Sequence, residues 1–70
     1  MIAWVRWASA RNNAGWELWY ISELPGEAGV DYGHTDKKAK ARYLTERQAR
    51  AFMKYRFACG DKPGSYGVTK

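Results

Sequence analysis

Basic side chains crowd into one part of this sequence, residues 37–56. Eight lysines and arginines stand there against the single acid Glu46, giving 8 − 1 = +7, whereas the rest, with 4 basic and 6 acidic residues, sums to −2. A field this one-sided attracts an anionic partner, either nucleic acid or an acidic protein surface. Merely solvated surfaces usually mix both signs, which favours a binding role. The candidate binding residues of this segment are Lys37, Lys38, Lys40, Arg42, Arg47, Arg50 and Lys54.

Residue types suited to catalysis or metal binding are scarce. His34, the single histidine, lies next to a glycine in a segment expected to be a loop, and a general base needs an orienting partner. Cys59 would lie near the C-terminal end of a helix, where the helix dipole does not stabilise a thiolate. One histidine and one cysteine also fall short of the four ligands of a structural zinc site. We therefore expect a binding domain rather than an enzyme, with no catalytic residue, metal or cofactor.

Tryptophans form a second group of candidates. Four of them fall within the first 19 residues: Trp4, Trp7, Trp16 and Trp19. They would form either a stacking platform for single-stranded bases or part of the core, which is the commoner role. One short helix cannot bury four tryptophans on a hairpin, so one or two should stay exposed. Beside arginine, an exposed tryptophan suits an anchor in a protein interface, which adds four candidates: Trp4, Trp7, Arg6 and Arg11.

The elements that would position these residues begin with a hairpin. β-Branched and aromatic residues predict strands at Ile2 to Ala8 and Trp16 to Ser22, joined by a turn at residues 9–15 that is rich in Asn and Gly. In the second strand, alternation gives two faces, one with Trp16, Leu18 and Tyr20, the other with Glu17, Trp19 and Ile21. Both faces carry apolar groups, so an aromatic side chain stays exposed unless both are covered.

The middle of the chain is less regular. Residues 23–36 contain one proline and three glycines and are expected to form a long loop. Residues 37–44 alternate basic side chains with Ala39, Ala41 and Tyr43, which favours a third strand carrying Lys38, Lys40 and Arg42 on its other side. A helix stays open as the alternative, because Ala and Lys both favour helix.

A helix is predicted from Thr45 onward. Thr45 and Gln48 have the spacing of a capping box, and Leu44 would pack back onto Ala49. The helix should run to about Cys59 and stop at a glycine.

Helical spacing then assigns the two sides of this helix. The expected buried stripe is Ala49, Phe52, Met53 and Phe57. Arg47, Arg50 and Lys54 fall on a largely opposite side. Arg56 lies within the stripe and would either extend outward or pair with a carboxylate.

These elements predict one small α+β domain over residues 1–60, an antiparallel hairpin or three-stranded sheet with one C-terminal helix, in the order ββ(β)α. Residues 61–70 are expected to form a flexible polar tail, with an edge strand at residues 65–69 as the alternative. With 70 residues and one cysteine, the chain lacks an internal disulfide, which indicates a reducing compartment. We expect a cytoplasmic monomer that does not bind membranes.

Residues 33–49, Gly-His-Thr-Asp-Lys-Lys-Ala-Lys-Ala-Arg-Tyr-Leu-Thr-Glu-Arg-Gln-Ala, resemble a pattern of small phage-encoded proteins. In these proteins an aromatic hairpin leads to a strand and then a short helix, a likeness that covers Trp16 to Phe57. Size, basicity and the tryptophan-rich start are similar to a phage regulator family, known from a Xanthomonas phage, that binds host RNA polymerase. The resemblance implies a host-takeover protein that blocks initiation and promotes antitermination in the host cytoplasm.

Two other functions stay open at this point. The basic residues would bind phosphates directly, without sequence specificity, since a single helix does not make a helix-turn-helix. Alternatively, the partner would be a host nuclease or defence complex that the protein inhibits. A DNA mimic is excluded, because such a protein must be acidic.

Overall fold

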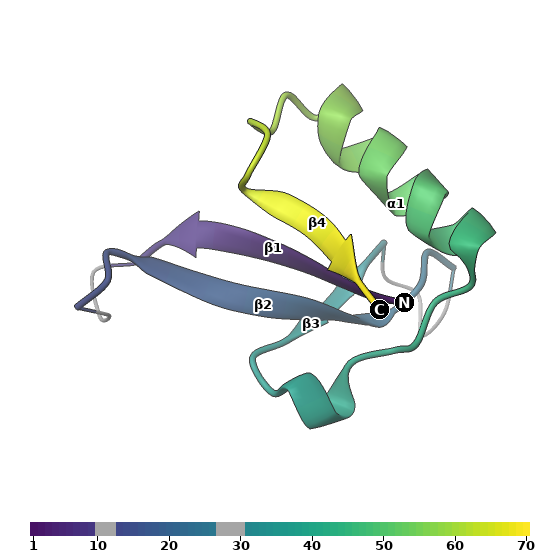
Figure 1. Cartoon of the computed structure of the whole chain (residues 1–70), viewed down its shortest axis with the longest axis horizontal. Helices are drawn as coiled ribbons and strands as arrows, with labels where there is room; N and C mark the ends of the chain where they lie inside the picture. The colour runs from purple at the N-terminus through teal and green to yellow at the C-terminus, as the bar shows by residue number, and fades with distance from the viewer. Residues whose placement is uncertain (10–12, 27–30) are drawn as a thin grey trace.

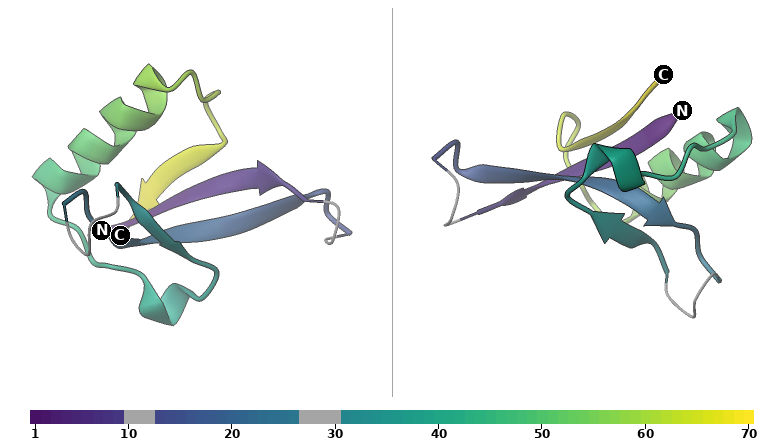
Figure 2. Two further views of the ribbon diagram at one scale, coloured as in Figure 1. Left: turned by 180° about the vertical axis from the view of Figure 1, so that it is seen from behind. Right: turned by 90° about the horizontal axis from the view of Figure 1, so that it is seen from below.

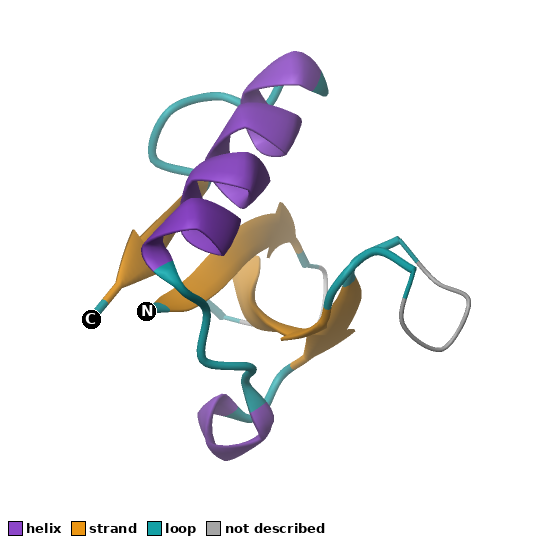
Figure 3. Ribbon diagram, turned by 90° about the vertical axis from the view of Figure 1, so that its right-hand side faces the viewer, coloured by secondary structure: helices purple, strands orange, loops and turns teal. Residues whose placement is uncertain are grey.

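The computed structural model of the protein describes residues 1–9, 13–26 and 31–70. Its elements are, in chain order, β1 (Ile2–Ala8), β2 (Trp16–Glu23), β3 (Gly33–Thr35), a 3-10 turn (Lys38–Lys40), α1 (Glu46–Ala58) and β4 (Tyr66–Thr69). The strands form one antiparallel sheet in the order β3-β2-β1-β4, with α1 on one side of it (Figure 1; Figure 3). The predicted α+β class, an antiparallel sheet with one helix, is confirmed, and the sheet has four strands.

The predicted hairpin is present as β1 and β2. Trp4 pairs with Tyr20 and Ala8 with Trp16, so residues that alternate along each strand meet partners on the same face. Beyond the helix, the far end of this hairpin projects from the rest of the molecule (Figure 2). The helix therefore covers only part of the sheet.

The covered face carries the core. It consists of six buried apolar residues: Ala3, Val5, Ile21, Leu44, Ala49 and Phe52. Phe52 is fully buried, and the ring of Tyr32 meets it edge-on at 5.5 Å between centroids. Leu44 and Ala49 share this core, as the predicted packing of the residue before the helix cap requires.

Two hydrogen bonds join Met1 to Leu44, the residue just before the helix cap. The Met1 amino group donates to the Leu44 carbonyl at 2.8 Å, and the Leu44 N–H donates to the Met1 carbonyl at 2.6 Å. Thr45 then begins α1 with the predicted capping box, in which Gln48 and Thr45 each bond the backbone of the other. These bonds hold the start of the helix against the edge of the core.

The third strand predicted at residues 37–44 is wrong. Lys38–Lys40 form a 3-10 turn, and from this segment only Tyr43 makes a bridge, to Ile2. The strand beside β2 is instead β3, inside the predicted loop, and the other edge of β1 is taken by β4. The sheet positions beside β2 and β1 are therefore occupied, and Ala39 and Ala41 offer little apolar surface for packing. The segment accordingly forms a helical turn, a conformation that Ala and Lys favour.

The predicted buried stripe of α1 is wrong at Phe57, whose exposed fraction is 74 %. Ala49 and Phe52 are buried and Met53 partly so, but the next position on that side is Arg56. Its side chain is 14 % exposed and forms an ion pair with Asp61, one of the two outcomes expected for it. Arg56 therefore occupies the position on this side that was expected for Phe57, and the Phe57 ring faces solvent.

The C-terminal segment is part of the sheet and not a flexible tail after residue 60. β4 pairs with β1 from Ile2 opposite Thr69 to Val5 opposite Tyr66, so the alternative edge strand is the one observed. Gly60 and Gly64, at positive φ of 86° and 91°, help the chain reverse after the helix. The domain therefore extends across the predicted boundary.

Candidate functional site

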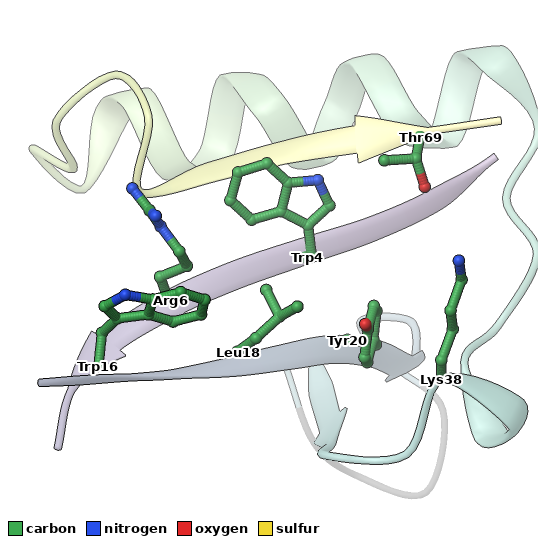
Figure 4. Close-up of a pocket in the computed structure, with 7 residues that line it drawn as sticks. All are labelled: Trp4, Arg6, Trp16, Leu18, Tyr20, Lys38 and Thr69. Atoms are coloured by element: carbon green, nitrogen blue, oxygen red, sulfur yellow. The ribbon is translucent and has the colours of Figure 1, made fainter. Parts of the chain in front are cut away.

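A groove crosses the face of the sheet that the helix does not cover. Its volume is about 320 Å³. The register puts the even-numbered residues of β1 and β2 on this face, together with Gly67 and Thr69 of β4. The lining residues are Trp4, Arg6, Trp16, Leu18, Tyr20, Lys38 and Thr69 (Figure 4). We call this surface the open face.

Arg6 and Trp16 form one end of the groove. The guanidinium carbon of Arg6 lies 5.0 Å from the centre of the Trp16 ring, a distance typical of a cation–π contact. Arg6 also donates to the Gly64 carbonyl at 2.7 Å, which holds the guanidinium in place. Trp16 stays 38 % exposed, so part of its ring remains accessible beside a fixed cation.

Trp4 lies in the middle of the groove, where Gly67 leaves room for its ring. A Cβ atom built on Gly67 would lie 2.6 Å from Cζ2 of Trp4, so the indole occupies the space that a side chain would fill. Trp4 is half-buried as a result. Glycine at this strand position thus allows a large ring to lie against the sheet.

Tyr20 and Lys38 form the other end. Lys38 belongs to the 3-10 turn, and its side chain extends over the sheet next to Tyr20 (Figure 4). Arg6 and Lys38 are the charged residues of the lining, both are positive, and no acid lines the groove in the described part of the chain. The open face therefore combines aromatic surface with a cation at each end.

Trp7 is nearly as exposed as Trp16, 37 % against 38 %, but lies on the opposite face. Its ring meets the His34 ring edge-on at 4.9 Å and lies 6.0 Å from the Trp19 ring. Burial lowers the pKa of His34, and the charge of Arg56 adds to that effect. Burial and the charge of Arg56 thus both favour the neutral form of the His34 ring.

The predicted basic residues do not form one surface. Lys37, Lys40 and Arg42 are exposed in or beside the turn that carries Lys38, so the predicted strand with Lys38, Lys40 and Arg42 along one side does not exist. Arg47, Arg50 and Lys54 are exposed on α1, which lies on the other side of the sheet. Arg50 is paired with Glu46 at 2.6 Å.

Of the predicted tryptophan and arginine candidates, Trp4 and Arg6 line the groove, Trp7 does not, and Arg11 lies outside the described residues. Sequence reasoning considered Trp16 as one of four possible stacking tryptophans but did not keep it in the final set, and it left Leu18, Tyr20 and Thr69 out. The alternation in β2 was the available signal, since it puts the first three on one face. This alternation does not indicate that α1 packs on the other face of the sheet.

Two kinds of feature are absent from residues 1–9, 13–26 and 31–70. No helix among them is long and apolar enough to cross a membrane. In the same ranges, no three side chains of His, Cys, Asp or Glu gather where a metal ion would bind.

Comparisons with protein-family models, with curated proteins and with solved structures found no match to this chain. The likeness to phage regulators therefore stays a prediction. The open face is the feature of the structure from which a function can be inferred.

Proposed function

We propose that this domain binds single-stranded nucleic acid on its open face, with bases stacked on aromatic rings and phosphates held by Arg6 and Lys38. The observation that carries the proposal is the groove in which an arginine lies over Trp16 at 5.0 Å while a lysine closes the other end. Proteins that bind single strands combine a cationic groove with exposed aromatic rings. An antiparallel sheet with one face uncovered by helix supplies that surface.

Stacking supplies the contact energy in this proposal. Alanine substitution of a stacking aromatic costs about 1–3 kcal/mol per base, and every base has a face to stack. Two phosphate contacts would supply a modest electrostatic share, because binding to a single strand falls with salt at a log–log slope of about −0.7 per contact. The expected slope is thus about −1.4, steeper if Lys37 and Lys40, next to Lys38, also reach phosphates.

The test measures the binding of a fluorescein-labelled oligothymidylate of about 12 nucleotides by anisotropy, over a range of salt concentrations. Trp16→Ala should weaken binding about tenfold or more. Trp7→Ala is the matched control, because it removes an equally exposed tryptophan from the other face. Thermal melting of each variant separates loss of affinity from loss of fold.

Charge is tested by a second pair of variants. Lys38→Ala should weaken binding and make the salt slope shallower by about 0.7, whereas Lys54→Ala, which removes an exposed lysine from α1, should change neither. If both lysines matter equally, or if Trp16→Ala binds like the unmodified protein, the open face is not the binding site.

Binding to host RNA polymerase, which the resemblance to phage regulators implies, stays a separate prediction, as does inhibition of a host nuclease or defence complex. A pull-down from host lysate with and without nuclease treatment tests both. Polymerase retained only without nuclease would indicate a nucleic-acid bridge through the open face. Retention after nuclease treatment would indicate a direct protein contact, and no retention would reject the regulator hypothesis.

A further inference from the structure

The outward side of α1 carries four exposed residues in a line: Arg47, Arg50, Lys54 and Phe57. Their spacing of three, four and three residues keeps them on one stripe of the helix. We call this stripe the outer helix face. It lies away from the core residues Ala49 and Phe52. The helix itself packs on one side of the sheet (Figure 3), and the open face is the other side.

The cations of the outer helix face differ in how they are engaged. Arg50 donates to Glu46 at 2.6 Å, as an i,i+4 pair on the helix surface. Arg47 and Lys54 have no ion-pair partner in the described part of the chain. Two cations about two turns apart are thus available to carboxylates or phosphates from outside.

Phe57 decides between these two kinds of anion. Its ring is 74 % exposed, the largest value among the big apolar side chains of the described residues. Burying such a ring is favourable, and aromatic and arginine side chains are the usual anchors of protein interfaces. A nucleic acid would meet this ring only with a base, and the outer helix face has one aromatic ring where the open face has three on which successive bases would stack. A protein with an apolar hollow buries such a single ring.

The charge then specifies the partner. A second copy of this basic chain would bring like charges together at Arg47 and Lys54, which costs free energy. An acidic surface would gain from both. We propose that the outer helix face binds an acidic protein surface through carboxylates on Arg47 and Lys54, with Phe57 inserted into an apolar hollow of that partner.

This proposal is independent of nucleic-acid binding on the open face, so the two can fail separately. The probe is a fluorescein-labelled amphipathic peptide of about 20 residues, composed of Asp, Glu, Leu and Phe. A second peptide keeps the acidic residues and replaces Leu and Phe by Ser, and a DNA duplex tests phosphates alone. Anisotropy measures all three against the full-length protein.

Two variants locate the contact, and two serve as controls. Phe57→Ala should weaken binding of the amphipathic peptide about tenfold or more, with little change in melting temperature because the ring is exposed. The double variant Arg47→Glu, Lys54→Glu should slow association and flatten its salt dependence. Lys62→Glu is the control, since it reverses an exposed charge outside the helix, and Trp16→Ala should bind the peptide normally.

Binding of the amphipathic peptide that depends on Phe57 and on the two cations supports the proposal. Equal binding by the Ser-substituted peptide or by duplex DNA would identify a simple anion-binding surface and overturn it. No binding of the amphipathic peptide, or binding unchanged by Phe57→Ala, would also overturn it.

Discussion

The two faces of the central sheet carry similar residue types but meet different surroundings. On the face toward α1, Val5 and Ile21 are fully buried against Phe52 of the helix. On the open face, Trp4 and Tyr20 pair with each other across the same two strands and are not covered by α1. They line a groove with a cation at each end. The first arrangement stabilises the fold, whereas the second leaves aromatic surface for a ligand.

The comparison teaches that aromatic content alone does not separate core from binding surface. Trp7 and Trp16 are almost equally exposed, yet Trp7 packs against His34 and Trp16 against the guanidinium of Arg6. What distinguishes them is the side of the strand on which they lie and what covers that side. The following predictions probe that difference, from the largest expected effect to the smallest.

The largest effect should come from the covered face. Phe52→Ala removes the largest fully buried side chain and should lower the free energy of unfolding by about 3–5 kcal/mol, enough to unfold much of a domain of this size. Leu18→Ala, on the open face, should cost clearly less, because Leu18 lines an open groove. Urea denaturation measures both. Equal costs would mean that the open face is part of the core.

A smaller effect should come from filling the space beside Gly67 that the Trp4 ring occupies. Gly67→Ala puts a Cβ atom 2.6 Å from the Trp4 ring, which must shift at a cost of about 1–3 kcal/mol. The same displacement should weaken oligonucleotide binding. Gly26→Ala is a control of a different kind, because it introduces only backbone strain, at positive φ and with nothing nearby. Loss of stability with unchanged affinity would exclude Trp4 from the binding surface.

Weakening the helix cap should affect stability alone. Thr45→Ala removes the side-chain oxygen that accepts from the Gln48 N–H and should cost about 1 kcal/mol, whereas Thr45→Ser should cost much less. Oligonucleotide affinity should not change while the protein stays folded, because the cap is remote from the groove. A drop in affinity would mean that the two faces are coupled.

The smallest effect should be a pH dependence from the covered face. The pKa of His34 lies below its ordinary value because of burial, with Arg56 adding to the shift. The folded state then binds fewer protons than the unfolded state, so stability is full above the unfolded pKa of about 6.5 and is lost as pH falls through the folded value. The buried Nε2 of His34, which has no hydrogen-bond partner among the described residues, agrees with a neutral ring.

Thermal melting at pH values from about 8 to about 5 tests this pH dependence, because the range extends at least about one unit on each side of the ordinary pKa of histidine. His34→Gln should melt with a weaker dependence on pH than the unmodified protein. Arg56, whose charge acts on His34, and Asp61, the partner of Arg56, are both unchanged in that variant, so the difference isolates the imidazole. Identical pH profiles would show that His34 is not desolvated by the fold.

Local rules predicted much of this protein correctly. The hairpin follows from β-branched and aromatic runs around an Asn- and Gly-rich turn, and the helix start follows from Thr45 and Gln48. Both depend on residues within a few positions of each other. The alternation of Trp16, Leu18 and Tyr20 is also a local pattern, so the sequence placed these residues on one face of the strand. It did not indicate that α1 leaves this face open.

Tertiary structure decided the rest. β4 pairs with β1 across almost the whole length of the chain, as in Ile2 opposite Thr69, and no local pattern measures that pairing. Because β3 and β4 occupy the two sheet positions, the Lys-rich segment forms a turn and delivers Lys38 to the open face. Likewise the sequence by itself determined that cations and aromatic rings would be abundant. Only the packing of α1 on one side of the sheet decided which rings are core and which line the groove, because β2 carries apolar side chains on both faces and the alternation does not tell which face is covered.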